Sequence, residues 1–501
     1  MNQPQIQLDS KSTIELRWQV YHEIRHLIET GEWLAGTRLP SSRQLADLLG
    51  VSRKTVIHAY EQLTKEGYLE GRSGSGTFVN KALKNHKIEG DPHLPGISKS
   101  KVARDAKKTN HSIHLSRYAK ELLSLPQPRT REAQPEIQLF NWQNTHSEMP
   151  TTPLTEFFAR EFVLAQRNFT CSVRDPRGYE PLRCSIVAHL QKTRGVKCSP
   201  EQVLIVSGLQ QAVDLTARVQ IEPGSGVVFE EPCYPVVRTA FRLYGAKIVP
   251  VPVDEQGILV RSVVQKKRTK QIALAYVTPS HHFPTGVILS LARRLELLDW
   301  AEKQNTLIFE DDYDSEFGYT NLPVPALQGL RDGHSVIYFG SFSKVLVPTL
   351  SLGYLIVPKP LADVYYKAIV QLTDQLPLQL QHAIAGFIDS DNLERHVKRL
   401  RAHYGKRREA LMEALKAHLG ERVKILGDPS GLHVLIELKS NMTDEQLIER
   451  AAELGVGLVS TASFYSGKPK PKEFVIGYAN LTEEAIDKGI RILRRALTSK
   501  R

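Results

Sequence analysis

One lysine stands where lysines are seldom found. Lys344 follows a Gly-Ser-Phe-Ser turn and lies between two apolar runs, residues 336–339 and 352–357, that are typical of buried strands. A lysine is almost never fully buried without a partner. Removal from water lowers the pKa of its amine and makes it a usable nucleophile, as in lysines that form Schiff bases. The alternative is a solvated lysine in a surface loop, and this stretch alone does not choose between the two.

A second group of residues suits a phosphate. Ser207, Gly208 and Leu209 open a predicted helix, whose N-terminal amides and serine hydroxyl favour an anion. Ser341 and Ser343 come just before the lysine and offer two further hydroxyl groups. A simple helix cap would explain the first group equally well, but the spacing of both groups around strand ends favours a phosphorylated ligand.

A third group suits an aromatic ring. Tyr234 follows a strand and offers a flat face for stacking. Asp311, at another strand end, can hold the proton of a pyridinium nitrogen, and Tyr313 can bond to a ring hydroxyl. With Lys344 as the catalytic Schiff-base amine, the three groups predict pyridoxal 5'-phosphate as the cofactor. Each residue alone also has an ordinary explanation, such as a core tyrosine or a solvated acidic loop.

These residues sit at the ends of short apolar segments that alternate with helical patterns. Such alternation predicts an α/β domain with a mostly parallel sheet covered by helices on both faces. Open sheets of this kind bind ligands at the carboxyl ends of their strands, which is where the polar residues fall. The predicted strands are residues 203–206, 226–230, 248–253, 271–277, 306–310 and 335–339.

The first 80 residues carry a different pattern. Apolar residues recur at helical spacing over residues 12–31, followed by two short helices that meet at Gly50 and a Gly-rich hairpin over residues 67–79. Ser41 or Ser42 can cap the first short helix. This order predicts a winged helix-turn-helix.

In such modules the start of the second short helix enters the DNA major groove, and the wing approaches the backbone. The alternative is a small helical interaction domain with a solvated basic face, since residues 1–80 hold nine basic and nine acidic side chains. We expect DNA contacts from Arg43, Ser52, Arg53, Lys54, Thr55, His58, Arg72, Gly74 and Gly76.

The formal net charge of +12 is concentrated between these two parts. Residues 81–131 hold twelve basic and four acidic side chains, in a polar stretch that predicts a flexible linker with one short helix over residues 115–125. Such a linker can add salt-dependent contacts to DNA, or simply keep the chain soluble. The four cysteines form no CxxC pair, which argues against a zinc site and favours a reducing cytoplasm. We expect no metal, no signal peptide and no membrane span.

Residues 39–79 resemble the winged helix-turn-helix of GntR-type bacterial regulators, and the body resembles the fold type I aminotransferases. The whole chain is similar to the MocR subfamily, in which the two are fused. The resemblance predicts a DNA-binding domain at 1–80, a basic linker at 81–135, an aminotransferase-like large domain at 136–385 and a smaller C-terminal domain at 386–501. The motifs that carry it are DPRGYEPLR (175–183), EEPCYP (230–235), VTPSHHFPTG (277–286), EDDYDSEF (310–317), SFSK (341–344) and HVKRLRAHYGKRREAL (396–411).

The chain departs from the subfamily pattern at three places. Ser351 stands where an arginine for the cofactor phosphate is expected, and Val475 where an arginine for a substrate carboxylate is expected. The aminotransferase asparagine that touches the ring hydroxyl is not evident within residues 279–284, where His281 and His282 are the candidates to replace it. The effector therefore binds its carboxylate elsewhere or has none.

The resemblance implies a homodimeric transcription regulator that binds double-stranded operator DNA. Its body would bind pyridoxal 5'-phosphate at Lys344 and sense the cofactor, an amine or an amino acid. Two alternatives stay open: an active aminotransferase with an appended DNA-binding head, and a regulator that has lost the cofactor.

Overall fold

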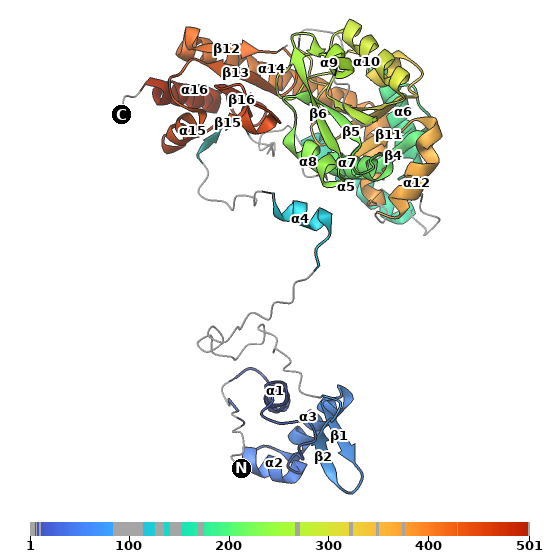
Figure 1. Cartoon of the computed structure of the whole chain (residues 1–501), viewed down its shortest axis with the longest axis vertical. Helices are drawn as coiled ribbons and strands as arrows, with labels where there is room; N and C mark the ends of the chain where they lie inside the picture. The colour runs from blue at the N-terminus through green and yellow to red at the C-terminus, as the bar shows by residue number, and fades with distance from the viewer. Residues whose placement is uncertain are drawn as a thin grey trace. The chain divides into compact units, whose positions relative to one another are not determined.

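The computed structural model describes residues 6, 8–9, 12–83, 114–125, 135–140, 152–168, 175–265, 271–319, 324–346, 350–372, 376–427 and 429–498. The chain divides into two compact units, Met1–Ile113 and His114–Arg501. We call them the head and the body and describe each by itself (Figure 1). Most of the predicted linker lies outside the described residues.

The head is a winged helix-turn-helix, as predicted. Its hairpin is antiparallel, and Leu69 pairs with Val79. Val20, Ile24 and Val56 are completely buried between the helices. The elements are α1 (Leu16–Glu29), α2 (Ser42–Leu49), α3 (Arg53–Lys65), β1 (Leu69–Arg72) and β2 (Gly76–Val79).

Local signals explain where these helices begin and end. The Ser41 side chain accepts a hydrogen bond from the Gln44 amide, and the Gln44 side chain bonds back to the Ser41 amide. Gly50 ends α2 with a φ of 64°, a left-handed conformation that costs glycine little. Ser52 then caps α3 by accepting a hydrogen bond from the Thr55 amide at 3.1 Å.

The body is built on an eight-stranded sheet of order β4-β11-β10-β9-β8-β5-β6-β7. The five strands from β10 to β6 are parallel neighbours, which confirms the predicted mostly parallel sheet. The strand after the lysine, β11, runs antiparallel to both β10 and β4. Their bounds are β4 (Val203–Val206), β5 (Gly226–Glu231), β6 (Lys247–Asp254), β7 (Gly257–Ile258), β8 (Ile272–Val277), β9 (Leu307–Asp312), β10 (Val336–Ser341) and β11 (Gly353–Ile356).

Helices cover both faces of this sheet (Figure 1). Successive strand residues point to opposite faces, so Phe309 joins the apolar core on the α7 and α8 side while Ile308 joins the core on the α9 and α10 side. The elements are α5 (Thr152–Asn168), α6 (Glu180–Arg194), η1 (Pro200–Gln202), α7 (Gly208–Gln220), α8 (Pro235–Leu243), α9 (Val260–Gln265), α10 (Leu291–Gln304), α11 (Leu327–Leu330), η3 (Lys359–Leu361), α12 (Ala362–Val370) and α13 (Leu378–Asp389).

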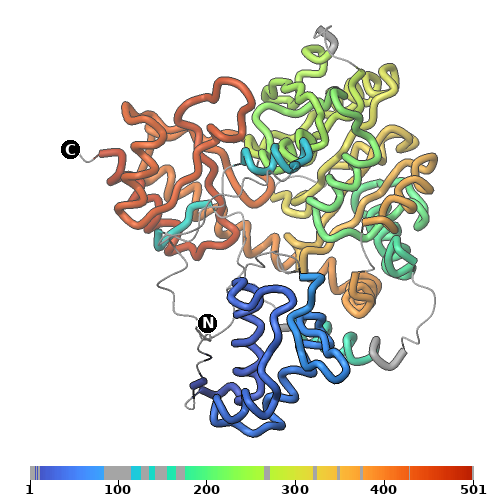
Figure 2. The backbone as a smooth tube through the Cα atoms, turned by 60° about the horizontal axis from the view of Figure 1, so that its bottom comes forward, coloured from blue at the N-terminus to red at the C-terminus, as the bar shows by residue number. Residues whose placement is uncertain are grey.

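The C-terminal part of the body is a second, smaller layer beside the large sheet (Figure 2). It holds an antiparallel sheet of order β12-β13-β16-β15. A separate two-stranded parallel sheet, in which β3 pairs with β14, attaches residues 135–140 to this part of the body. The elements are β3 (Ile137–Gln138), α14 (Asn392–Leu419), η4 (Gly420–Arg422), β12 (Val423–Leu426), β13 (His433–Leu438), α15 (Asp444–Glu453), β14 (Val456–Gly457), β15 (Val459–Ser460), η5 (Thr461–Phe464), β16 (Glu473–Gly477) and α16 (Glu483–Thr498).

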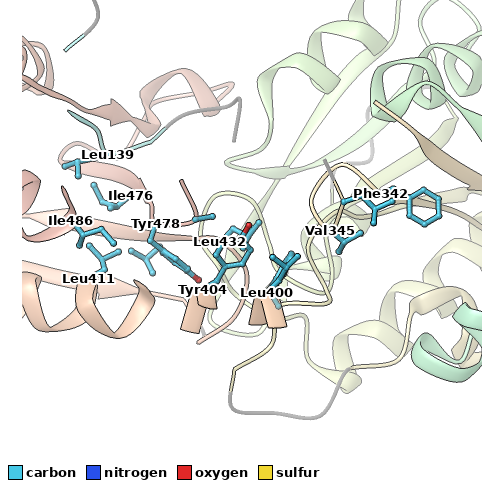
Figure 3. Packing of buried hydrophobic residues seen from close by; sticks show 14 of the residues in the cluster. Leu139, Phe342, Val345, Leu400, Tyr404, Leu411, Leu432, Ile476, Tyr478 and Ile486 are labelled. Atoms are coloured by element: carbon cyan, nitrogen blue, oxygen red, sulfur yellow. The ribbon is translucent and has the colours of Figure 1, made fainter. Parts of the chain in front are cut away.

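One apolar cluster connects this small part with the lysine loop (Figure 3). Ile476 of the small sheet and Leu411 and Leu400 of α14 belong to it, as do Phe342 and Val345 on either side of the lysine. The loop that carries Lys344 is therefore anchored in the core that the small part shares.

The short helix predicted over residues 115–125 is present as α4 (Arg117–Leu123), and it packs against α8. Tyr118 meets Tyr244 edge to face at 5.7 Å between ring centroids. An Arg117 Nη2 donates to the Leu243 carbonyl at 3.5 Å. The end of the linker is thus held against the body. Within the described parts of the chain, no helix is both long and apolar enough to span a membrane.

Candidate functional site

A cavity of about 350 Å³ lies where the parallel strands of the body end. Every residue that we predicted to hold a cofactor lines it, although these residues come from four separate strand ends. They are Ser207, Gly208, Leu209, Tyr234, Asp311, Tyr313, Ser341, Ser343 and Lys344. Further lining residues, which the sequence did not single out for the site, are Phe140, Gln210, Tyr276, Thr278, Phe283, Phe339, Leu432, His433 and Gly477.

One end of the cavity is lined by amides and hydroxyls. Helix α7 begins at Gly208, which has a φ of 77°, and the first amides of a helix have no partner within it. The Ser343 amide donates to Ser341 Oγ at 3.1 Å, which fixes the turn before the lysine. Ser351 also lines this end, with a φ of 42°. Together these groups can hold a phosphate through hydrogen bonds and the positive end of α7.

Two adjacent aspartates on β9 have opposite roles because side chains alternate along a strand. Asp312 points away from the cavity and pairs with Arg194 Nε at 2.9 Å, and it accepts a hydrogen bond from Tyr338 Oη at 2.5 Å. Asp311 lines the cavity and accepts a hydrogen bond from Tyr276 Oη. Asp312 thus forms an ion pair with Arg194, whereas Asp311 forms no ion pair within the described parts of the chain and feels only the more distant positive charge of Lys344.

The Asp311 carboxyl is left with an unused acceptor. Its Oδ1 is buried and has no hydrogen-bond partner among the described residues. Burial raises the pKa of Asp311 to about 7, and the nearby charges of Asp312 and Asp314 act in the same direction, while the Tyr276 hydrogen bond opposes them. A donor that carries a positive charge, such as a protonated ring nitrogen, would satisfy Oδ1 and stabilise the ionised form.

Lys344 lies in the same cavity, at the start of the loop between β10 and β11. Burial lowers the pKa of its amine below the ordinary value, and the negative charges of Asp314 and Asp311 oppose that shift. Phe342 and Val345 are buried in the core on either side, so the loop holds the amine in place. A partly desolvated amine of this kind can act as a nucleophile.

A chain of hydrogen bonds lies behind the cavity. Tyr313 Oη donates to the His281 carbonyl at 3.0 Å, and His281 Nδ1 lies 2.9 Å from Asp314 Oδ2. His433, which lines the cavity, donates from Nε2 to the Pro284 carbonyl at 3.2 Å. Burial lowers the pKa of His433 well below its ordinary value, as does the nearby His281, so the imidazole is neutral.

These hydrogen bonds change the expectation that His281 or His282 replaces the asparagine that would touch the cofactor. Neither His281 nor His282 lines the cavity among the described residues, and Phe283 takes that place instead. His281, Asp314 and His433 each place a ring nitrogen or carboxylate oxygen within 4.8 Å of the others. Atoms of these types can bind a metal ion, and the sequence analysis did not identify this group. The aspartate follows Tyr313 directly, but the histidine at 433 comes from a strand that is distant along the chain, and no local pattern marks it.

In the head, the predicted DNA-contacting residues divide into two groups. Arg43, Arg53 and Lys54 are exposed at the starts of α2 and α3. Arg53 Nε donates to Ser42 Oγ at 3.3 Å, which holds the guanidinium between the two helices. Ser52 caps α3, as described, and Thr55 Oγ1 lies 2.8 Å from Ser52 Oγ.

The second group, His58 and the wing residues, includes side chains that contact aromatic rings of the head. His58 is half-buried and meets Trp18 edge to face at 5.6 Å. Arg72 pairs with Glu70 at 2.5 Å and lies over the Phe78 ring. The wing glycines, Gly74 and Gly76, both have positive φ.

Arg38 is an exposed cation beside the wing that sequence reasoning missed. It forms a β-bridge with Phe78, and a side chain at position 76 would approach Arg38 Nε within 3.3 Å. The arginine lies between α1 and α2, outside the predicted helices, and only the folded hairpin brings it next to the wing.

Two family models match the chain. "Bacterial regulatory proteins, gntR family" matches residues 16–79, and "Aminotransferase class I and II" matches residues 155–493. Fold and site thus define a helix-turn-helix regulator whose second domain has an aminotransferase fold.

Curated relatives with the same two parts are similar over nearly their whole length. The chain is 33% identical to the "Uncharacterized HTH-type transcriptional regulator YdeL" of Bacillus subtilis, over 96% of this chain and 97% of that protein. It is also 33% identical to the "Probable rhizopine catabolism regulatory protein MocR" of Rhizobium meliloti, over 98% and 95%. The chain therefore belongs to the MocR-like regulators of the GntR family.

Solved structures similar to the body are aminotransferases. The chain is 27% identical to the kynurenine aminotransferase of Pyrococcus horikoshii, with a TM-score of 0.67 over 79% of this chain and 98% of that one. The multiple substrate aminotransferase of Thermococcus profundus has a TM-score of 0.66 at 27% identity, over 73% and 92%. These matches agree with the predicted fold type I architecture.

Proposed function

We propose that the protein is a transcription regulator whose body binds pyridoxal 5'-phosphate at Lys344 and senses an amine or amino acid there. The observation that carries the proposal is the cavity in which a desolvated lysine amine and the unpartnered Oδ1 of Asp311 occur together. A buried lysine without a ligand to attach, and a buried carboxyl oxygen without a donor, are both costly features for a purely structural domain.

The described residues fit this cofactor at both of its ends. Asp311 Oδ1 would accept the proton of the ring nitrogen, and Tyr234 lies in the same cavity with a ring that can stack. The amides that open α7 and the hydroxyl groups of Ser341 and Ser343 would hold the phosphate. The cofactor supplies an aldehyde, which bonds covalently to amines, and a ring that withdraws electrons.

The end of the cavity that would hold the phosphate has a neutral serine, Ser351, where an arginine is expected. Ser351 lines this end and donates at most one neutral hydrogen bond, whereas a guanidinium would make a charge-assisted bond that is roughly twice as strong. We therefore expect a cofactor that binds reversibly and that equilibrates with its free concentration. Such binding suits a sensor of the cofactor itself as well as a sensor of amines.

Other parts of the proposal concern the whole chain. The head would bind operator DNA through Arg43, Ser52, Arg53, Lys54, Thr55 and the wing, with His58 in a supporting position against Trp18. We further propose that the protein is a cytoplasmic homodimer. The domains would be residues 1–80, 81–135, 136–385 and 386–501.

The visible absorption spectrum of the purified protein with pyridoxal 5'-phosphate tests the proposal. We expect a band from cofactor bonded to lysine in the native chain and none in Lys344→Ala, with both proteins shown to be folded by circular dichroism. Mass spectrometry after borohydride reduction would place the cofactor on residue 344. A native chain that stays colourless at saturating cofactor would refute cofactor binding and leave a regulator of another kind.

Transamination is the second candidate function. Lys344, Asp311 and Tyr313 occur together in the cavity. With the cofactor ring held by Asp311 and Tyr313, the Lys344 amine would be the group that moves a proton. Steady turnover of an amino donor with a keto acid by the loaded protein, lost in Lys344→Ala, would support it.

A further inference from the structure

The wall of the cavity on the side of the small sheet is apolar and aromatic. Phe140, Phe283, Leu432 and His433 line it, and the Phe283 and His433 rings lie 5.1 Å apart. Phe140 packs beside both, with its ring centroid 6.3 Å from that of Phe283 and 6.4 Å from that of His433. This wall faces whatever ligand approaches the cofactor site.

The register of the small sheet places one more residue behind this wall. His433 pairs with Gly477 and Leu435 with Val475, so all four share one face of the sheet. His433 and Gly477 line the cavity, and the Val475 side chain therefore projects from the same face, two residues before Gly477 on β16.

Val475 is completely buried in an apolar cluster behind the cavity wall. The cluster is formed with Leu435 and Phe464, and Phe140 and Phe283 pack against it. Position 475 thus supports the aromatic wall with an aliphatic side chain rather than offering a polar group to the ligand.

The charges of the described lining residues also indicate that this wall offers nothing to a ligand carboxylate. His433 is neutral, because burial and the neighbouring His281 lower its pKa well below the ordinary value. Burial also raises the pKa of Tyr234 and Tyr313, so both phenols are neutral. Lys344 is the single lysine or arginine among the described lining residues, and the Asp311 carboxyl lies in the same cavity. A ligand carboxylate at the aromatic wall would lose its hydration without gaining an ion pair, which is costly.

We infer that the effector is a primary amine with an aromatic or branched aliphatic group and no carboxylate, and that Val475 determines this choice. The inference rests on the proposed function, since it selects the amine over the amino acid as the ligand sensed near Lys344. The apolar group packs against Phe140, Phe283 and Leu432. The same contacts disfavour a small polar amine, which gains little from burial there.

Matched ligand pairs test this on the unmodified protein loaded with pyridoxal 5'-phosphate. The pairs are 2-phenylethylamine with L-phenylalanine and 3-methylbutylamine with L-leucine, whose members differ only by the carboxylate, and ethanolamine serves as the polar amine. The visible spectrum and isothermal titration calorimetry report binding without any turnover. We expect each amine to bind at least about tenfold more tightly than its amino acid and than ethanolamine.

A substitution tests the role of position 475. Val475→Arg places a guanidinium behind the wall and should move the preference toward the amino acid by about tenfold or more, through a charge-assisted bond to its carboxylate. Val475→Ile is the matched control, since it keeps an apolar side chain and should keep the amine preference. The ligand pairs in the native chain decide the question even if the arginine variant does not fold.

The outcomes separate this inference from the proposed function. A protein that binds the cofactor but prefers amino acids to their amines, or that binds neither, overturns the inference and leaves the cofactor site standing. A protein that does not bind the cofactor at all overturns both. A native chain that prefers amines while a folded Val475→Arg variant keeps that preference refutes the role of Val475.

Discussion

Replacing Asp311 by asparagine should make the cofactor-free protein more stable at high pH. Burial raises the pKa of this carboxyl from 3.8 to about 7 in the folded state. The folded chain therefore holds the proton more tightly than the unfolded chain does. The contribution of this proton to the stability of the folded state is therefore complete below about pH 4, and it is lost as the pH rises to 7 and above. Asparagine does not titrate, so Asp311→Asn removes this loss.

The size of the effect follows from the two pKa values. Since a tenfold change in proton affinity is worth about 1.4 kcal/mol, the full rise from 3.8 to about 7 corresponds to roughly 4 kcal/mol. Between pH 5 and pH 8 the free energy of unfolding of the native chain should fall relative to that of the variant by about 3 kcal/mol. Other buried carboxyls with raised pKa, such as Glu230 and Glu316, are present in both proteins and largely cancel.

Urea unfolding of the cofactor-free proteins at pH 5, 6, 7 and 8 measures the difference. Asp312→Asn is the matched control on the same strand. It leaves the buried Arg194 without its partner at 2.9 Å and should destabilise the body at every pH, by about 3–5 kcal/mol. Parallel pH curves for the native chain and Asp311→Asn would refute the reasoning, because they would mean that Asp311 is ionised at little cost. With the cofactor present, Asp311→Asn should bind it at least about tenfold more weakly, since an amide cannot balance a ring cation.

Four further substitutions test other parts of the molecule. Ser351→Arg should tighten cofactor binding by about tenfold, measured by absorbance titration, and unchanged affinity would show that position 351 does not reach the phosphate. Arg43→Ala should weaken binding to all DNA and lower the salt slope by about one, whereas Arg53→Ala should cost about 1–3 kcal/mol and relax sequence preference, both by fluorescence anisotropy. Equal effects on specific and random DNA would contradict a base-reading role for Arg53. Tyr118→Ala should remove about 0.5–1.5 kcal/mol of ring contact with Tyr244 and speed proteolysis within α4, while an unchanged cleavage rate would mean that other contacts hold the helix.

The strand ends explain why much of the site was predictable. Ser207, Tyr234, Asp311 and Lys344 each follow a short apolar run, and parallel strands bring such positions to one edge of a sheet. The choice of Asp311 over Asp312 also agrees with the alternation of side chains along β9. The fold class followed from the same pattern of alternating strands and helices.

Other parts of the site depend on contacts between distant segments. Phe140 and His433 reach the cavity because β3 pairs with β14 and β13 pairs with β16, and neither segment carries a local signal of that pairing. His58 was expected to face DNA from its helical spacing, but its face of α3 also meets Trp18. The position of α1 decides how exposed the histidine is, and α1 is placed by packing rather than by local sequence.

The shared apolar cluster of Figure 3 ties the chemistry of Lys344 to the cooperativity of the body. Phe342 and Val345 have no separate core of their own and belong to the cluster that contains Leu400 and Ile476. Amides of the lysine loop should then exchange hydrogen with solvent at the rate of α14 and β16, as one unfolding unit. A change anywhere in the small part that loosens this unit would loosen the lysine as well, and the small part cannot be removed to leave a working pocket behind.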